Sequence, residues 1–333
     1  MAGSTEKTRI TLPYDCPVPP TSKHLYSDHF ARTRALPFIA ASNARDVKEL
    51  TECLRTHFNN VKVLERIVAP CDSSGNECAV YVAYNPLDNA IVIAFRSTNS
   101  AAQVARSQSS KPLECRFQLL VEAVDFMLQT QKDFQPVGGR VVSYFYDSFF
   151  ALWNGGLEHR LRSSLLHFPK AEVWIFGHSL GGALASLAAA WISRMGIVRA
   201  DSLKFVSFGQ PRTGDMKFAL AFDSLVPFKY RVVHRHDAIT QMPVRLPFTQ
   251  VTFIHHRYEV QNDMEPTAKC SICLRAEDPN CSQGEQDPPD PAIHRRYFNV
   301  TLADWPRTGC RLPPDLYHAY RQPLWMRGTK NHG

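Results

Sequence analysis

Residues 172–190 read EVWIFGHSLGGALASLAAA and place an apolar run, a glycine-rich corner and an alanine-rich segment in direct succession. Residues 173–176 are β-branched or aromatic, as in a buried strand, and the residues after Gly181 are strong helix formers without a breaker. Ser179 therefore lies on a strand-to-helix corner between Gly177 and Gly181, where a Cβ atom would meet the neighbouring backbone. In this context Gly-x-Ser-x-Gly predicts a nucleophile elbow; the alternative is a serine that merely caps the helix.

The composition of the chain excludes several classes of protein. The 333 residues carry a net charge of +7, but no block of five or more basic residues predicts a nucleic-acid arm. No run of about eighteen apolar residues predicts a membrane span. The first twenty residues lack the apolar core of a signal peptide, which leaves either a cytosolic protein or a chain without its leader.

The nine cysteines bear on the compartment. Cys71 and Cys78 bracket a turn-forming hexapeptide, which predicts a disulfide that closes a hairpin. Cys270 and Cys273 lie in a polar loop, where a zinc site or free thiols are alternatives to a disulfide, although no second paired motif at zinc-finger spacing follows. Two glycosylation sequons, at residues 280–282 and 299–301, add to the pattern. Together these features favour a secreted protein.

The periodicity of the chain predicts an extended arm, two helices, three strands in an antiparallel entry, and then alternating strands and helices. The expected elements are an arm over 1–24, helices over 28–41 (interrupted at its proline) and 46–58, strands over 61–69, 78–84 and 90–96, and an alternating part with helices over 144–167 and 216–225 and strands over 172–176, 203–208 and 228–234. This order predicts an α/β fold with a mostly parallel sheet that binds ligands at the carboxyl ends of its strands.

A serine hydroxyl is a poor nucleophile at neutral pH, so the elbow needs a histidine to accept its proton and a carboxylate to orient that histidine. In this fold class the order is serine, acid, histidine. Asp237 follows the strand expected over 228–234 and is the predicted acid, with a turn-forming Asx residue as the alternative. The candidates for the base are His255, His256, His294 and His318, and order alone does not choose among them.

Local sequence separates these histidines. His255 and His256 lie in the strand-like run TFIHHRYEV and are expected to point to opposite faces, one packed and one exposed. His318 lies in a late segment. His294 follows a Pro- and Cys-rich loop and precedes two aromatic residues, so a free loop places it and the core fixes it. We predict His294 as the base, with His318 as the runner-up.

The tetrahedral intermediate of ester cleavage needs hydrogen-bond donors for its oxyanion. One predicted donor is the backbone N–H of Leu180, next to the nucleophile, and the other is Thr98, in the loop that ends the strand IVIAFRST. The alternative for Ser97 and Thr98 is that they simply end a strand.

Six motifs occur in this order: IVIAFRST (91–98), GHSLGGALA (177–185), SFGQPRTGD (207–215), YRVVHRHDAITQMP (230–243), FIHHRYEV (253–260) and HRRYF (294–298). Over about residues 25–300 the chain resembles the class 3 lipases, the family of secreted fungal triacylglycerol lipases and feruloyl esterases, and its N-terminal part looks like secreted nematode members. The resemblance implies an α/β-hydrolase fold and a triad of Ser179, Asp237 and a loop histidine. It also implies Thr98 and Leu180 in the oxyanion hole, ester substrates, and no metal or other cofactor.

The chain departs from the family at two places. Ser97 stands where the family usually has glycine, so the loop is expected to have less backbone freedom. Residues 101–116 look inserted within a possible lid over 99–136. The apolar stripe over 117–128 predicts a helix that faces the core, with a mobile lid as the alternative.

These features predict a domain over residues 25–300, an extension over 301–333, and a serine hydrolase that acts on acylglycerols or other lipid esters. The alternatives are a catalytically silent lipid-binding or interaction protein and a small-ester or feruloyl esterase. The sequence does not predict an oligomeric state.

Overall fold

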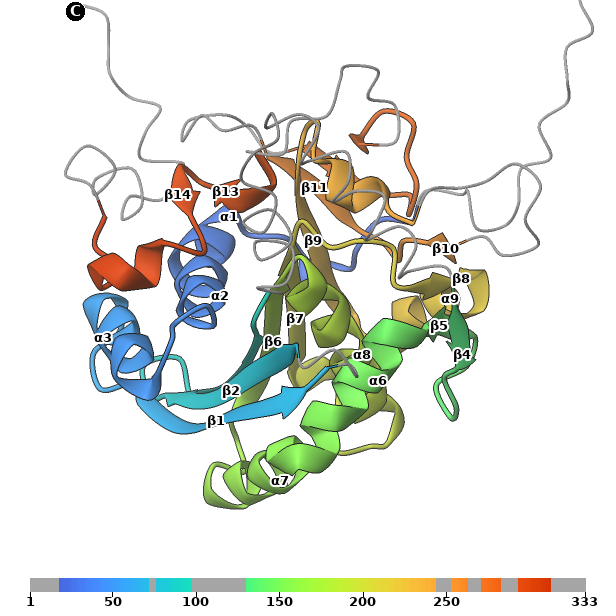
Figure 1. The fold of residues 1–333 in the computed structure, drawn as a ribbon. Coiled ribbons are helices and arrows are strands. Elements are labelled where there is room, and N and C mark those ends of the chain that lie inside the picture. The colour runs from blue at the N-terminus through green and yellow to red at the C-terminus, as the bar shows by residue number, and fades with distance from the viewer. Residues whose placement is uncertain are drawn as a thin grey trace, which may run out of the picture.

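The computed structural model describes residues 18–71, 76–97, 130–243, 253–262, 271–282 and 293–312. At its centre is an eight-stranded sheet with the order β1-β2-β3-β6-β7-β9-β11-β12 (Figure 1). Its strands are β1 (Lys62–Pro70), β2 (Glu77–Asn85), β3 (Ala90–Phe95), β6 (Glu172–His178), β7 (Leu203–Phe208), β9 (Phe228–His234), β11 (Glu259–Asn262) and β12 (Ser271–Cys273).

The pairing of these strands is parallel in the middle of the sheet and antiparallel at its two edges. β1, β2 and β3 form an antiparallel entry. From β3 through β6, β7 and β9 to β11 each neighbouring pair is parallel, and β12 closes the far edge antiparallel to β11. The predicted mostly parallel sheet with an antiparallel entry is therefore confirmed, and β6, β7 and β9 bring their carboxyl ends to one edge.

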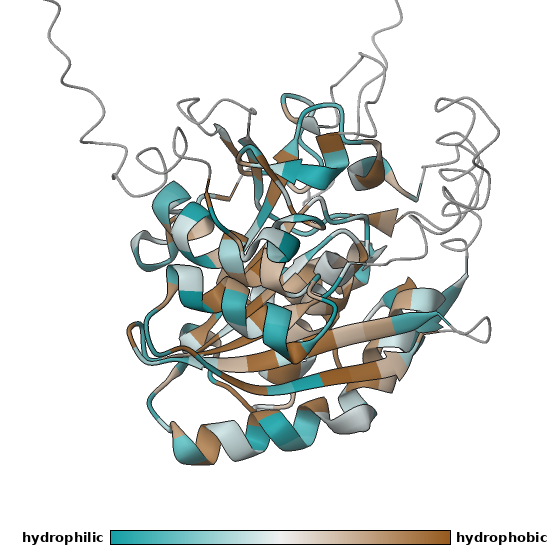
Figure 2. Ribbon diagram, turned by 60° about the vertical axis from the view of Figure 1, so that its left-hand side comes forward, coloured by the Kyte–Doolittle hydropathy of each residue, from teal (hydrophilic) through white to brown (hydrophobic). Residues whose placement is uncertain are grey.

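Both faces of the sheet are buried, because alternate residues of each strand enter different cores. In β2, Val80 and Val82 pack in one core and Tyr81 and Ala83 in the other. Figure 2 shows hydrophobic residues along the central strands and hydrophilic ones on the outer turns of the covering helices. Burial of both faces explains why the strands read as continuous apolar runs.

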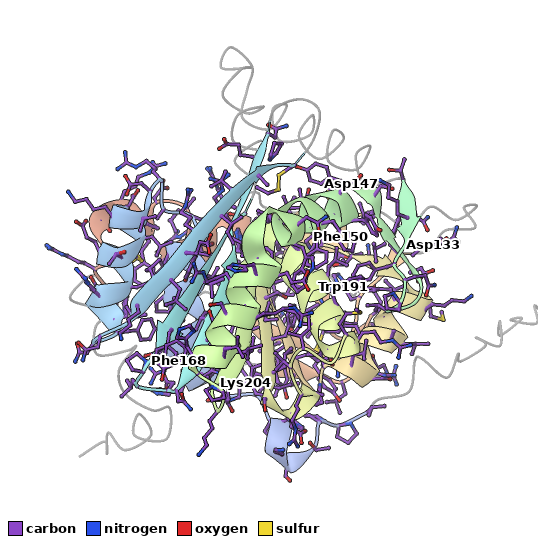
Figure 3. The ribbon with its side chains drawn as sticks, turned by 90° about the horizontal axis from the view of Figure 1, so that it is seen from below. Asp133, Asp147, Phe150, Phe168, Trp191 and Lys204 are labelled. Atoms are coloured by element: carbon purple, nitrogen blue, oxygen red, sulfur yellow. A yellow bond between two sulfur atoms is a disulfide. The ribbon has the colours of Figure 1, made fainter. Side chains whose placement is uncertain are left out.

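Helices cover the two faces of the sheet (Figure 1). One layer holds α6 (Ser143–Leu152), α7 (Glu158–His167), α8 (Leu180–Arg194) and α9 (Met216–Leu225); the other holds α1 (Asp28–Phe30), α2 (Leu36–Ala41) and α3 (Val47–His57). Phe150 of α6 meets Trp191 of α8 edge to face, with 5.0 Å between ring centroids (Figure 3). This contact helps to fix α6 against the helix that follows the predicted nucleophile.

Two of the predicted helices are divided. The helix over 28–41 is interrupted, as predicted, next to Pro37: a wide-turned stretch, η3 (Ala31–Ala35), separates α1 from α2 and puts Pro37 in the first turn of α2, where its missing N–H costs little. The helix over 144–167 is also broken, at η4 (Trp153–Leu157), which was not predicted. Gly156 has a φ of 131° there, outside any helix.

Two smaller sheets lie beside the main one. Four short strands pair antiparallel in the order β10-β8-β5-β4, and β13 pairs with β14. Their bounds are β4 (Gln131–Asp133), β5 (Arg140–Val142), β8 (Gly214–Asp215), β10 (Phe253–Ile254), β13 (Arg296–Tyr297) and β14 (Val300–Thr301). Short 3-10 turns complete the described chain: η2 (Ser22–His24), η5 (Ala200–Ser202), η6 (Ala238–Gln241), η8 (Ile293–Arg295) and η9 (Trp305–Thr308).

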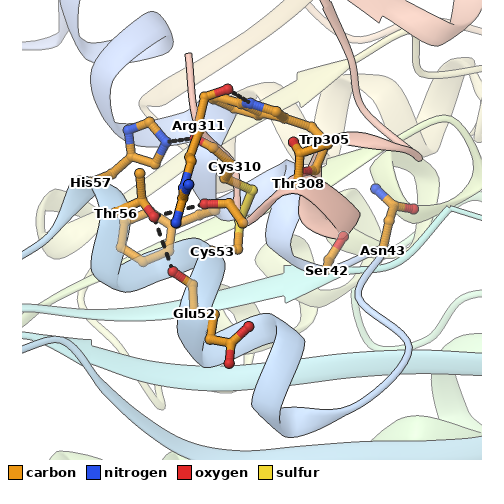
Figure 4. Close-up of a disulfide and its surroundings, with 12 residues drawn as sticks. Ser42, Asn43, Glu52, Cys53, Thr56, His57, Trp305, Thr308, Cys310 and Arg311 are labelled. Carbon is orange, nitrogen blue, oxygen red and sulfur yellow. Dashed lines mark hydrogen bonds between the residues drawn. A yellow bond between two sulfur atoms is a disulfide. The ribbon is translucent and has the colours of Figure 1, made fainter. Parts of the chain in front are cut away.

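Three disulfides join described residues: Cys53–Cys310, Cys71–Cys78 and Cys273–Cys281. The structure thus pairs Cys71 with Cys78, as predicted, across the hairpin of β1 and β2 at a Cα–Cα distance of 5.3 Å. It also places Cys273 in a disulfide; Cys270 lies outside the described residues. The Cys53–Cys310 bond ties α3 to the segment after β14, and hydrogen bonds from Thr56 to the Gly309 carbonyl and between His57 and the Cys310 carbonyl, each 2.7 Å, support it (Figure 4).

The described part of the predicted extension, 301–312, packs with the N-terminal helices. Leu302, Trp305 and Cys310 are buried in the same core as α2 and α3. The domain limits at residues 24 and 300 stay predictions. Several other predictions fall outside the described residues: Thr98, the insertion over 101–116, the helix over 117–128, His318, and all of the suggested lid except 130–136. No described helix has the length and hydropathy that a membrane span requires.

Candidate active site

Ser179 occupies the corner between β6 and α8, where its backbone has φ 57° and ψ −128°. This conformation is costly for a residue with a side chain and indicates a functional constraint. The Ser179 amide donates a 2.9 Å hydrogen bond to the Phe208 carbonyl at the end of β7. The Ser179 side chain makes no capping hydrogen bond to α8, so the alternative that this serine only caps the helix lacks support.

The two glycines of the corner allow close contact between backbones. A Cβ atom on Gly177 would collide with the Gly181 carbonyl, which belongs to the first turn of α8. A Cβ atom on Gly181 would collide with the Phe95 carbonyl and lie 2.8 Å from the Arg96 carbonyl. The start of α8 therefore presses against the ends of both β6 and β3, as the sequence predicted for these two positions.

Leu180 is the first residue of α8, a position whose amide has no partner within the helix. Its N–H belongs to the helix N-terminus, where the partial positive charge of the helix dipole favours an anion. The oxyanion role of Leu180 stays a prediction, which its place at the start of α8 is compatible with. Ser97 is the last described residue before Thr98, whose predicted role rests on the sequence alone.

Asp237 follows β9 and caps the 3-10 turn η6. Its Oδ1 accepts a 3.0 Å hydrogen bond from the Ile239 amide, so the residue does form the turn that was weighed as its alternative function. The same carboxylate also accepts hydrogen bonds from His294 Nδ1, at 2.8 Å to Oδ2 and 3.0 Å to Oδ1. A turn contact and a histidine contact therefore coexist on one carboxylate.

Burial and charge act in opposite directions on Asp237, whose exposed fraction is 2%. Burial is the largest single influence and raises the pKa of this carboxyl, but the charge and hydrogen bond of His294, together with smaller contributions that include the Ile239 amide, hold the pKa below its usual value. Asp237 is therefore ionised at neutral pH and accepts a hydrogen bond from Nδ1 of His294, which carries the proton. This leaves Nε2 as the nitrogen that can exchange a proton with a substrate or nucleophile.

Tyr297 adds a second donor to this carboxylate. Its hydroxyl lies 3.1 Å from Asp237 Oδ2, and its ring stacks on Phe208 with 5.0 Å between centroids. Burial, together with the Asp237 carboxylate, raises the pKa of Tyr297 well above its usual value, so the hydroxyl keeps its proton and donates. The sequence signal for Tyr297 was its place three residues after His294, but a specific partner was not predicted.

His178, which precedes the serine, was not predicted to belong to the site. Its Nε2 lies 2.8 Å from the His294 carbonyl oxygen, and the two imidazole rings lie 4.7 Å apart. Because a carbonyl only accepts, Nε2 of His178 carries the hydrogen. Burial, and to a lesser extent the charge of His294, lower the pKa of His178 to about 3, so it is neutral and holds the backbone of His294.

These elements converge on Gly209, which follows β7 with a φ of 56°. A Cβ atom here would lie 2.8 Å from the Tyr297 hydroxyl and 3.0 Å from both Asp237 Oδ2 and His294 Cε1. The carbonyl of the preceding residue, Phe208, accepts the hydrogen bond from the Ser179 amide. The structure therefore brings Ser179, Asp237 and His294 to one edge of the sheet, at the carboxyl ends of β6, β7 and β9.

The other described histidine candidates lie elsewhere. His255 and His256 are each only 1% exposed, so the expectation of one exposed residue is wrong. They lie between β10 and β11, which belong to different sheets, and not within one strand. His255 Nε2 contacts the Thr240 carbonyl at 2.8 Å and His256 stacks on Phe222, which gives both of them structural partners.

No group of three or more His, Cys, Asp or Glu side chains within the described ranges is arranged to hold a metal ion. The groups that the structure describes at this edge of the sheet are a hydroxyl, an imidazole paired with a carboxylate, and a helix N-terminus.

Comparison with known proteins agrees with this architecture. Residues 92–246 match the family described as Lipase (class 3). Lipase ZK262.3 of Caenorhabditis elegans is 28% identical over 84% of this chain and 83% of that protein. Secreted mono- and diacylglycerol lipase 3 of Gibberella zeae is 25% identical over 46% of this chain and 44% of that protein.

A solved structure gives the same result for the fold. The lipase from Rhizopus microsporus var. chinensis superposes with a TM-score of 0.66 at 24% identity, covering 91% of this chain and 99% of the other. The protein thus has the predicted α/β-hydrolase fold. The family match over residues 92–246 and the nematode relative support the predicted resemblance to the class 3 lipases and, with it, a lipase-like carboxylic ester hydrolase.

Proposed function

We propose that this protein is a serine hydrolase that cleaves carboxylic esters through an acyl-enzyme, with acylglycerol lipids as the substrate class. The observation that carries the proposal is the strained Ser179 at the same sheet edge as the 2.8 Å pair of His294 and Asp237. The names of the lipase relatives support the choice of an acylglycerol ester.

In the proposed reaction the Ser179 hydroxyl attacks the ester carbonyl while His294 Nε2 takes the hydroxyl proton. Asp237 stabilises the imidazolium that forms and keeps its Nδ1 proton in place. The oxyanion is bound by the Leu180 amide and by Thr98. Collapse of the intermediate transfers the proton from His294 to the leaving alcohol, and water then repeats the sequence to release the carboxylic acid and free Ser179.

We also propose a secreted protein. Three disulfides within the described chain fit an oxidising compartment better than a reducing one. The name of the Gibberella zeae relative, a secreted lipase, supports the same location. Measuring the protein in culture medium and in cells of its source, with antibodies, tests this part of the proposal.

The central test is hydrolysis of p-nitrophenyl esters of increasing acyl length by the wild type and by Ser179→Ala, together with labelling by a fluorophosphonate probe. We expect activity that rises with acyl length, and loss of both turnover and labelling in the variant. A preference for the shortest esters would identify a small-ester esterase. A wild type that is neither labelled nor active would identify a silent, binding protein.

The base is tested by His294→Ala, which is expected to cost about as much kcat as Ser179→Ala. The double variant should lose little more, because members of a triad act as a unit. His318→Ala is the comparison. If His318→Ala abolishes turnover while His294→Ala keeps it, the proposed base is wrong.

A further inference from the structure

Strand β3 leaves the sheet beside the predicted oxyanion site, and its end is fixed by a side chain from the N-terminal helical layer. At this strand end the Arg96 amide donates a 2.9 Å hydrogen bond to the Ala79 carbonyl of β2. At the next residue, the Ser97 hydroxyl donates a 2.7 Å hydrogen bond to Asn43 Oδ1. Asn43 follows α2 and is 54 residues away in sequence.

The side-chain amide of Asn43 both accepts and donates hydrogen bonds at this position. Its Oδ1 accepts from Ser97, and its Nδ2 donates to the Ile39 carbonyl of α2 at 3.3 Å and to the Leu302 carbonyl at 3.5 Å. The Leu302 amide in turn donates to the carbonyl of Arg295, 3.0 Å away, next to His294. One side chain therefore connects the end of β3 to the hairpin that carries the predicted base.

The position of this strand end matters because α8 begins against it. A Cβ atom on Gly181 would collide with the Phe95 and Arg96 carbonyls, so the first turn of α8 packs directly on the end of β3. If the end of β3 moves, this first turn loses the surface on which it packs. That turn begins with Leu180, whose amide is the predicted oxyanion donor among the described residues. Oxyanion donors must be held to within about half an ångström to stabilise a transition state.

We propose that Asn43, acting through Ser97 and the end of β3, is a positioning residue for the Leu180 amide, the oxyanion donor at the start of α8; the inference rests on the proposed ester hydrolysis. It also gives the departure from the family at Ser97 a function. Ser97 is not among the described residues with a positive φ, so glycine is not required at this position. The Ser97 hydroxyl fixes the end of β3 through its hydrogen bond to Asn43, and removing this hydroxyl lowers activity.

The test compares Ser97→Ala, Ser97→Thr, Asn43→Ala and the double alanine variant in p-nitrophenyl butyrate hydrolysis, with active sites counted by phosphonate titration. We expect kcat to fall about tenfold in either single alanine variant, with KM within about twofold, because the oxyanion exists only in the transition state. The double variant should lose no more than a single one, and Ser97→Thr, which keeps the hydroxyl, should retain most of the rate.

A second readout separates positioning from general loosening of the fold. A boronic acid inhibitor forms a tetrahedral adduct with the serine, and its affinity should fall by the same factor as kcat. Thr56→Ala is the matched control, since its hydroxyl also ties a helix of this layer to a carbonyl, that of Gly309, without contacting β3 (Figure 4). It should leave kcat and boronate affinity unchanged even where thermal stability falls.

Two results would overturn the inference. With an active wild type, alanine variants that keep kcat and boronate affinity within twofold would show that the tether positions nothing of catalytic value. Losses equal to those of Thr56→Ala would assign Asn43 to the general stability of the fold. A wild type without phosphonate labelling would overturn the proposed function as well, so the two failures are distinguishable.

Discussion

Tyr297 donates a 3.1 Å hydrogen bond to Asp237 Oδ2, the oxygen that also receives the 2.8 Å hydrogen bond from His294. One carboxylate oxygen is thus shared by the imidazole and by a phenol that never ionises near neutral pH. The phenol draws negative charge away from the His294 contact and fixes the orientation of the carboxylate. Tyr297 is thus a third residue in direct contact with the Asp237–His294 pair.

Tyr297→Phe keeps the stacking on Phe208 and removes the hydroxyl. We expect kcat/KM to fall by roughly threefold to tenfold, because a hydrogen bond to a charged group contributes about 1.5–3 kcal/mol and part of it is expressed in the transition state. The loss should arise because the Asp237 carboxylate is no longer held in its orientation toward His294. A kcat/KM equal to that of the wild type would contradict the shared-oxygen interpretation.

His178 makes stability depend on pH. Its folded-state pKa is lowered to about 3, below the ordinary 6.5, so between these values the unfolded chain binds a proton that the folded protein does not. Stability should therefore fall as the pH decreases from 6.5, and His178 alone accounts for a loss of about 2–3 kcal/mol by pH 4.5.

This expectation is checked by urea unfolding at pH 7 and pH 4.5. His178→Asn should lose less stability between the two pH values than the wild type, although the buried His256, whose pKa is also lowered, keeps part of the dependence. His159→Asn, at an exposed position, is the control. Equal losses in all three proteins would contradict the role of His178.

The disulfides should differ in their contribution to stability. Cys53–Cys310 spans 257 residues and Cys71–Cys78 spans 7, and on the loop-entropy model the long loop contributes about 5 kcal/mol against about 2 for the short one. The double variants Cys53→Ala/Cys310→Ala and Cys71→Ala/Cys78→Ala, compared by Tm, test this ranking. A larger loss of Tm from the hairpin pair would reverse it.

Gly181→Ala places a methyl group against the Phe95 and Arg96 carbonyls, which are backbone atoms and cannot rotate away. We expect a loss of about 2–3 kcal/mol and at least a tenfold loss of kcat, because α8 must move from β3. Gly155→Ala is the matched control, since its nearest neighbour is a side-chain carbon at 3.7 Å. Calorimetry and ester hydrolysis measure both effects, and a Gly181→Ala protein as active as Gly155→Ala would contradict the close contact.

The local chemistry of the chain determined much of the fold. The apolar runs, the corner glycines and the alternation of strand and helix patterns predicted β6, α8, β7 and β9 close to their observed bounds, because each depends on neighbouring residues. Asp237 could be placed for the same reason, since a carboxylate directly after a buried strand lies at the ligand-binding edge. The interruption of helix 28–41 could be predicted from Pro37, but the wide-turned form that it takes has no residue signature.

Only the tertiary structure decided which distant residues meet. The Tyr297 hydroxyl on Asp237, the His178 ring on the His294 carbonyl and the Asn43 amide on Ser97 join residues 54 to 116 positions apart. Cys53 and Cys310 are joined across most of the chain. No periodicity encodes such pairs, because they depend on how the N-terminal helices and the C-terminal hairpin pack on the same face of the sheet. The sequence determined the groups that are proposed to react, and packing determined the groups that hold them in place.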